Sequence, residues 1–414
     1  MNTVKELDAV MTETAVVTDF SIGDMWEKLP EYAKQATKLG TSIASLYEAT
    51  TLYYQQGLQT NEAMGVGIET MKMARIANMD ATEATTAMTA ALRGFNMEVD
   101  EMNAQRVNDV YSELAAITAA DTNQIATAMG KTASIAASAN MEFETTAAFL
   151  AQIIETTQEA PETAGTAMKT IIARFTEVKE LFSEGMLTGE DSEGEEININ
   201  KIDAALRSVG ISLKDFLSGS KGMDEIFLEL ASKWDTLDLA TQRYIATTAA
   251  GSRQQSRFLA MMSNYDRTME LVTAANNSAG ASQEQFNKTA ESLEAKLQRL
   301  KNAWDTFVMG LANDEFLKGA VDILTTLLES LNGLINLLSG GEGTQKSILS
   351  LAMAFGALKT GGALFNSLFE GVKEAAKSSG ASGADAFGKA FKTSLGKNFG
   401  KMGEYIGSFL PNKK

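Results

Sequence analysis

The stretch Glu159–Leu181, EAPETAGTAMKTIIARFTEVKEL, decides the fold class of this 414-residue chain. It predicts a helix with a defined start, because the N–H that Pro161 lacks would have no partner in a first turn. Apolar residues then recur at three- and four-residue steps: Ala164, Met168, Ile171, Ile172, Phe175, Val178 and Leu181. This spacing places them on one face, which predicts a helix packed against other helices.

The rest of the composition extends this prediction to the whole chain. Only 3 prolines occur in 414 residues, and none lies between Pro161 and Pro411. No convincing run of alternating β-branched residues is present, and the nearest candidate, Ile197–Ile199, is short. We therefore predict an all-α fold: an extended array of helices and helical hairpins with coiled-coil segments and no substantial sheet.

The chain lacks the residues on which many enzyme classes depend. It contains no cysteine and no histidine, which excludes Ser-His-Asp triads, Cys-His peptidases, thiolate metal sites and H-E-x-x-H zinc sites. The dipeptide Glu291-Ser292 is of the type that carries a transglycosylase glutamate, and a first-turn glutamate at the start of a helix explains it better. We expect no enzymatic activity, no cofactor and no metal.

Charge is distributed unevenly along the chain. The net charge is -17, which argues against nucleic-acid binding because phosphates require clustered Lys and Arg. From Gly371 onward eight lysines oppose three carboxylates, so this end carries +5 and the first 370 residues carry -22. The basic end is therefore expected to meet a different partner from the acidic body.

The helix predicted for Glu159–Leu181 also carries a family resemblance. A small, glycine-containing stretch followed by a hydrophobic, Lys-Thr-containing helix with a downstream arginine is similar to the core of tail tape measure proteins of long-tailed bacteriophages. The residues that carry the resemblance are Gly165, Lys169, Thr170, Arg174 and Phe175.

Residues 1–182 form the first predicted block, a helical tape measure core with a loose repeat. Asn96-Met97-Glu98 recurs as Asn140-Met141-Glu142, and Gly57–Met64 is a weaker echo. Thr41 or Ser42, Asp80 and Asp121 are expected to cap the helices that begin each unit. A period of roughly forty residues is typical of stacked helical hairpins, although chance similarity in Ala/Thr/Met-rich text accounts for it equally.

Two further blocks follow the core. Residues 183–200 are rich in glutamate and glycine, fail the spacing of a calcium-binding loop and are expected to be a solvated acidic linker. Residues 201–280 are predicted to be a second helical block, with helix ends at Gly210, Gly219–Gly222 and Gly251.

Residues 281–340 contain the sharpest periodicity in the chain. Two runs of apolar residues alternate in steps of four and three, which is the pattern of a coiled-coil seam. The first run is Leu293, Leu297, Leu300, Trp304, Phe307 and Leu311, and the second is Leu317, Val321, Leu324, Leu328, Leu331, Ile335 and Leu338. An intermolecular coil and an intramolecular hairpin bent near residues 310–314 satisfy this pattern equally. The text around Trp304 also resembles the helix that follows the core in tape measure proteins.

The C-terminal region divides into two segments. Residues 341–370 are hydrophobic, and 347–369 have the length of a bilayer span with Lys359 near the centre, although a soluble hairpin bent at 361–362 fits as well. Residues 371–414 form a basic, glycine-rich amphipathic tail. Its membrane-facing candidates are Phe387, Phe391, Leu395, Phe399, Lys389 and Lys392.

The resemblance implies a function based on length. Several copies self-associate as a multi-copy bundle in the lumen of the tail tube, set tail length while the tube protein polymerises around them, and leave before the DNA. It further implies as partners the tail tube protein, the tail assembly chaperone, the distal tail protein and, late in infection, the host membrane. The implied location is the virion, with the host cytoplasm during assembly. From a different class, a membrane-active or pore-forming protein acting through residues 347–410 is the alternative.

Overall fold

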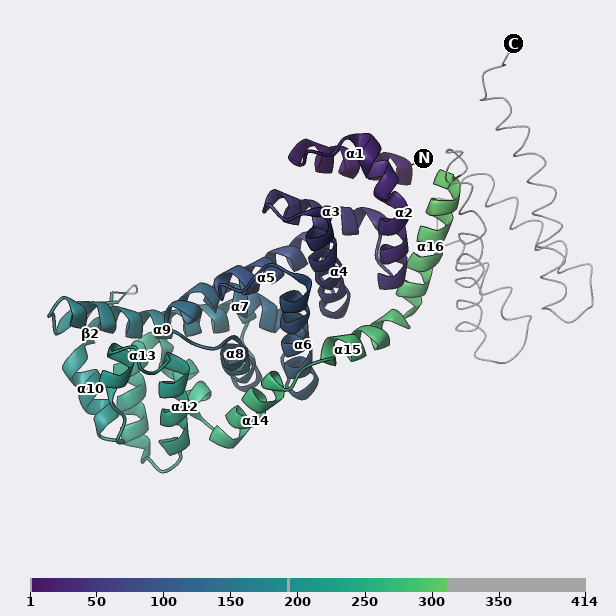
Figure 1. Ribbon diagram of the computed structural model, residues 1–414. Coiled ribbons are helices and arrows are strands. Elements are labelled where there is room, and N and C mark those ends of the chain that lie inside the picture. Colours follow the sequence, from purple (N-terminus) through teal and green to yellow (C-terminus); the bar gives the residue numbers. More distant parts are fainter. Residues whose placement is uncertain (1, 192–193, 311–414) are drawn as a thin grey trace, which may run out of the picture. The chain divides into compact units, whose positions relative to one another are not determined.

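The computed structural model describes residues 2–191 and 194–310, and these are helical apart from one β-hairpin (Figure 1). The all-α prediction is confirmed. The predicted seam from Leu311 to Leu338, the hydrophobic segment 341–370 and the basic tail 371–414 lie outside the described residues. The block boundaries proposed from the sequence stay predictions.

The chain forms two compact units. One comprises residues 10–35 and 43–290, and the described part of the other comprises residues 2–9, 36–42 and 291–310. The first two helices, α1 (Asn2–Val17) and α2 (Ile22–Leu39), contribute to both units. In the larger unit, the ring of Tyr32 in α2 stacks on that of Tyr47 with centroids 3.7 Å apart.

Three consecutive helical hairpins form the centre of the larger unit. They are α3 (Ile43–Gln55) with α4 (Thr60–Ala77), α5 (Ala81–Gly94) with α6 (Glu101–Ile117), and α7 (Thr122–Ser138) with α8 (Phe143–Thr157). Neighbouring odd-numbered helices pack on one another, from α3 through α5 and α7 to α9 (Pro161–Ser183), and α4, α6 and α8 form a second row. Stacking neighbouring hairpins in this way buries a continuous apolar core.

The same turn closes the first helix of each hairpin. Gly57, Asn96 and Asn140 have φ of 90°, 54° and 55°, the left-handed conformation that glycine and asparagine tolerate at a helix end. The next N–H then bonds to the carbonyl five residues earlier, for example Met97 N to Leu92 O at 2.8 Å and Met141 N to Ala136 O at 3.0 Å. These turns lie at the three places where the sequence shows its loose repeat.

The caps predicted at Asp80 and Asp121 are confirmed, and the one at Thr41 or Ser42 stays a prediction. Asp80 and Asp121 each accept a hydrogen bond from the backbone N–H three residues later, both at 2.8 Å. Pro161 stands at the start of α9, which ends two residues beyond the predicted Leu181.

The remaining helices of this unit run back along the hairpins. After α9 come α10 (Ile199–Arg207), α11 (Leu213–Leu217) and α12 (Met223–Trp234). Phe175 of α9 packs edge-on against Phe216 of α11 and Phe227 of α12, and these three rings form an aromatic cluster. We call α13 (Leu239–Met262), α14 (Tyr265–Asn276) and α15 (Ala281–Ala290) the return layer. α13 packs on α8 and α9, α14 on α6 and α8, and α15 on α4 and α6 (Figure 1).

The segment expected to be a solvated linker is different in the structure. Residues 188–190 (β1) and 196–198 (β2) form a two-stranded antiparallel hairpin in which Gly189 pairs with Ile197. Ile197 and Ile199 are buried, and so is the carboxylate of Asp191. The linker expectation is wrong for these residues because two isoleucines and an ion pair attach the acidic run to the protein. The hairpin is too short to produce an alternating strand signal.

The smaller unit contains α16 (Leu293–Gly310), the start of the predicted seam. It contacts residues 37–41: Asn302 Nδ2 donates to Thr41 O at 2.6 Å, and Arg299 Nε donates to Thr37 O at 3.3 Å. Of the predicted seam residues, Leu300 is buried and Leu297 is half-buried. For Leu293, Trp304 and Phe307 only the helical backbone is described.

Candidate functional site

The five residues that carry the family resemblance lie along α9. Gly165, Thr170, Arg174 and Phe175 are buried on the faces that meet the rest of the larger unit, and Lys169 is exposed. These residues follow one another along the helix and do not gather around one point. They form successive packing positions along one helix, so the site is best described as a structural junction.

Gly165 marks a close crossing of α9 with α7. A Cβ built there would overlap the carbonyl oxygen of Ala128 and lie 2.9 Å from the Ala128 Cα, both backbone atoms of α7. Thr132 Oγ1 donates to Gly165 O at 3.0 Å and to Ala128 O at 3.1 Å, so one hydroxyl bridges the two helices. Only glycine allows the α7 and α9 backbones to approach this closely.

Arg174, about two and a half turns further along α9, is buried and ion-paired. The residue is 3% exposed, forms an ion pair with Asp191 in the hairpin turn and donates to Glu196 O at 2.5 Å. A buried guanidinium requires such a carboxylate because removing an unpaired charge from water is very costly. The pair fixes the β-hairpin against α9.

The hairpin in turn caps a kinked helix. Gly251 interrupts α13 with φ 77° and ψ 167°, and the following Ser252 donates to Glu195 through its N–H at 2.7 Å and through its hydroxyl at 2.5 Å. Gly251 was predicted to end a helix, and its backbone is indeed non-helical: two helical segments of α13 meet there at a kink, and Glu195 satisfies the first N–H after the break. We call Arg174, Asp191, Glu195 and Ser252 the Arg174 cluster.

The pKa values of two carboxyl groups close to Arg174 are shifted in opposite directions. The hydrogen bonds from Ser252 hold the pKa of Glu195 below its usual value. Burial, followed by the neighbouring charge of Asp191, raises the pKa of Glu177. The Glu195 carboxylate thus has a structural use as the acceptor for both donors of Ser252.

These shifts predict a pH dependence for Glu195. Glu195→Gln is expected to lower the free energy of unfolding at pH 7 by about 1 kcal/mol, the typical value of a helix cap. The folded pKa is lowered, so the carboxylate stabilises the protein above its unfolded pKa and loses this effect as pH falls through the folded pKa. The difference between variant and wild type should therefore shrink between about pH 5 and pH 3.

Urea unfolding at several pH values measures this effect. Glu190→Gln is the matched control, because Glu190 is exposed on the same hairpin and lies outside the Arg174 cluster. A Glu195→Gln difference that stays constant down to about pH 3 would contradict the ionic role of this carboxylate.

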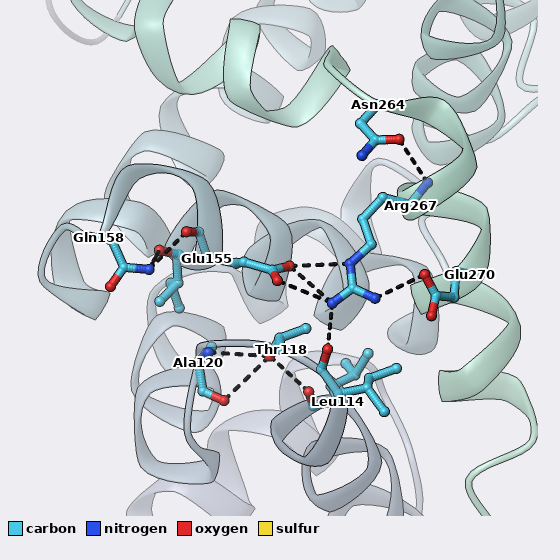
Figure 2. A network of polar contacts seen from close by, with 10 residues as sticks. Leu114, Thr118, Ala120, Glu155, Gln158, Asn264, Arg267 and Glu270 are labelled. Atoms are coloured by element: carbon cyan, nitrogen blue, oxygen red, sulfur yellow. Dashed lines mark hydrogen bonds and ion pairs between the residues drawn. The ribbon is translucent and has the colours of Figure 1, made fainter.

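A second polar network fastens the return layer (Figure 2). Arg267 of α14 donates to Glu155 of α8 at 3.1–3.3 Å, to Glu270 at 2.9 Å and to the carbonyl oxygen of Ile117 at the end of α6. One side chain thereby connects two hairpins to α14. Similar bridges are Arg257 to Glu159 at 2.7 Å and Gln152 to Ser263 O at 2.7 Å.

The structure shows which residues of the junction the sequence did not indicate. Asp191, Glu195 and Gly251 were assigned to a linker or a helix end, and Arg267 was not singled out. The usable signal was Arg174 itself, because an arginine on an apolar helix face needs a carboxylate partner. Within residues 2–191 and 194–310, no group of three or more acidic residues is arranged to hold a metal ion. In the same part of the chain, no helix is both long and apolar enough to cross a bilayer.

Comparison with known proteins places this architecture in context. A profile of the family described as phage-related minor tail protein matches residues 33–251, from within α2 to the kink in α13. The tape measure protein of Pneumococcus phage Dp-1 is 24% identical over 285 residues, which are 68% of this chain and 23% of that protein. The chain thus spans less than a quarter of that relative's length. No solved structure matches it significantly.

Proposed function

The chain belongs to the phage-related minor tail protein family, and on this premise we propose that it acts as a tail tape measure protein or as a section of one. The family match carries the proposal, because it covers the three hairpins, α9 and all of the Arg174 cluster except Ser252. The name of the phage Dp-1 relative supports the same assignment. A phage tail component is a structural part of the virion, which agrees with a non-catalytic role.

The proposed mechanism is measurement by length. Copies of the chain lie in the lumen of the growing tube, the tube protein polymerises around them, and growth stops when the tape is covered. A fully helical chain of 414 residues would span at most about 620 Å at 1.5 Å per residue. The seam predicted for residues 281–340 supports self-association of the copies, since a heptad stripe is apolar along one face.

The proposed partners follow from this mechanism. They are the tail tube protein, the assembly chaperone and the distal tail protein in the infected cytoplasm, and the host membrane once the tape has left the tube. The acidic charge of residues 1–370 supports a tape that does not retain the outgoing DNA. The chain would then leave the tube before the genome.

Tail length tests the proposal directly. In-frame removal of seven-residue units between Leu317 and Leu338 preserves the apolar stripe. Each heptad removed should shorten the tail by about 10 Å, because a helix rises 1.5 Å per residue. Insertion of one heptad in the same register should lengthen it equally. Electron microscopy of assembled particles measures both.

A control separates length from sequence. Exchanging two heptads within the same interval alters the local sequence and keeps the residue count, so tail length should stay constant. Tails of unchanged length after both deletion and insertion would refute the ruler mechanism for this region.

A further inference from the structure

α15 is attached to the hairpins largely through polar contacts. Its buried residues are Ser282, Phe286 and Ala290, so it buries one large apolar side chain. By comparison, α9 buries Met168 and Phe175 together with two isoleucines and a valine. Elements with few buried apolar contacts open at low free energy, which makes α15 a candidate for local release.

Asp109 of α6 is the main attachment point of α15. It is 5% exposed and accepts hydrogen bonds from Gly280 N and Ser282 N, both at 3.0 Å, and from the hydroxyl of Ser282. It therefore caps the N-terminus of a helix that lies 171–173 residues later in the chain. Gln285 adds one bond, from Nε2 to Ser112 O at 2.6 Å.

The helices beneath α15 are joined independently of it. Asn108 of α6 donates to Glu69 of α4, at 2.8 Å to the backbone oxygen and at 3.0 Å to the carboxylate. Glu69 also pairs with Lys72 at 2.7 Å. Release of α15 would thus leave the contact between α4 and α6 in place and would open Asp109 and Ser112 to water.

The buried apolar residues of α15 are in register with the seam of α16. Phe286 and Ala290 precede Leu293 and Leu297 in steps of four, three and four, which continues the alternation of the predicted coiled coil upstream. The break between the two helices is confined to residues 291–292. A single helix across this break would place Phe286 and Ala290 on the seam.

The contacts of α16 with residues 37–41 use its opposite face. Ala295 lies against Gly40, where an added Cβ would be 3.0 Å from the Ala295 Cβ, and Arg299 and Asn302 donate to backbone oxygens. These three residues occupy the outer c and f positions of the heptad. The hydrogen bonds to residues 37–41 therefore come from outer positions, whereas the seam residue Leu300 is itself buried.

We propose that α15 exchanges between two partners: the α4–α6 pair of its own chain, and the same segment of a second copy of this chain. In the first state Asp109 caps α15, and Phe286 faces the hairpins. In the second state α15 joins α16 in one helix, and Phe286 and Ala290 extend the coiled coil between copies. The proposal rests on the self-association included in the proposed function. It adds that the coiled coil between copies begins at α15, and that the α4–α6 pair of the same chain competes with the second copy for α15.

Photocrosslinking in the full-length chain tests the exchange. A photoreactive phenylalanine analogue replaces Phe286, and equal amounts of unlabelled and ¹⁵N-labelled protein are mixed before irradiation. Mass spectrometry then distinguishes intrachain products with α4 or α6 from products that join residues 281–310 of two copies. The probe at Lys288, an exposed outer position of the heptad, serves as the negative control.

Asp109→Ala shifts the balance without altering the seam. We expect the ratio of interchain to intrachain products at position 286 to rise about fivefold, the factor that loss of a cap worth about 1 kcal/mol produces. Hydrogen exchange of residues 280–290 should quicken in the variant at low protein concentration. Asp80→Ala removes a cap of the same kind from α5 and should leave both measurements unchanged.

The outcomes separate this proposal from the proposed function. A third probe, at Leu297, reports on the seam itself. Interchain products at Leu297 with none at Phe286, even in Asp109→Ala, would overturn the exchange and leave self-association intact. Absence of interchain products at both positions would refute self-association through this seam, and with it the exchange. Faster hydrogen exchange without a rise in the product ratio would also overturn the exchange.

Discussion

Replacing Arg174 with alanine is expected to lower the free energy of unfolding of the larger unit by about 3–5 kcal/mol, the usual cost of removing one partner of a buried ion pair. The substitution leaves Asp191 buried without its cation, next to Glu177, whose pKa burial and Asp191 already raise. It also removes the donor to Glu196 O that fixes the β-hairpin. Because Glu195 of this hairpin accepts both hydrogen bonds from Ser252, the destabilisation should extend from α9 to the helix that starts at Ser252.

Chemical denaturation of the full-length chain measures this loss. Trp234 packs against Phe258 with ring centroids 6.0 Å apart and reports on the aromatic cluster around α9, once Trp26 and Trp304 are replaced by phenylalanine. Arg207→Ala is the matched control, because its ion pair with Asp203 leaves the Arg207 side chain 65% and the Asp203 side chain 29% exposed. An exposed pair is typically worth less than about 1 kcal/mol.

A double substitution distinguishes charge from packing. Arg174→Met with Asp191→Ala removes both charges and keeps an apolar chain in the α9 position, so it should recover much of the loss. Equal losses for Arg174→Ala and Arg207→Ala would contradict the structural role of the buried pair. In a phage, the Arg174→Ala chain is expected to reduce the number of assembled tails, because less folded protein is available.

Local physics explains why the sequence predicts much of this fold. Asp80, Asp121 and Pro161 act within one turn of their own position, so their caps and starts are visible in the sequence. The same holds for the left-handed residues Asn96 and Asn140, whose recurrence marks the ends of equivalent helices. The apolar face of α9 is likewise a property of its own spacing.

The return layer and the Arg174 cluster could not be predicted in this way. Asp109 and Ser282 are 173 residues apart, and Glu155 and Arg267 are 112 residues apart, so no local pattern connects them. Asp191 stands in a run of acidic residues, and nothing in the sequence distinguishes its buried carboxylate from the solvated carboxylates beside it. The heptad spacing that links Phe286 to Leu293 can be read from the sequence. Only the structure shows that Phe286 is buried in a separate helix, α15.

Gly165→Ala and Gly130→Ala are expected to change stability in opposite directions, although both replace a glycine in one of two adjoining helices. Alanine gains about 1 kcal/mol over glycine in a helix interior. At Gly130 of α7 the nearest atom to an added Cβ is 4.0 Å away, so this gain should appear almost in full. At Gly165 the added Cβ meets backbone atoms of Ala128, which cannot rotate away.

The cost at Gly165 should therefore exceed the gain. Forcing atoms into a packed interface typically costs about 1–3 kcal/mol, and displacement of α9 would also break the bonds from Thr132 that bridge it to α7. We expect a net loss of about 1–2 kcal/mol for Gly165→Ala, and a larger one for Gly165→Leu, because three more carbon atoms must then fit between the helices. Denaturation midpoints of the full-length variants measure both signs. If Gly165→Ala stabilised the protein as much as Gly130→Ala, the α7 and α9 backbones would have to separate freely. The close crossing of these helices would then not be the reason for glycine at position 165.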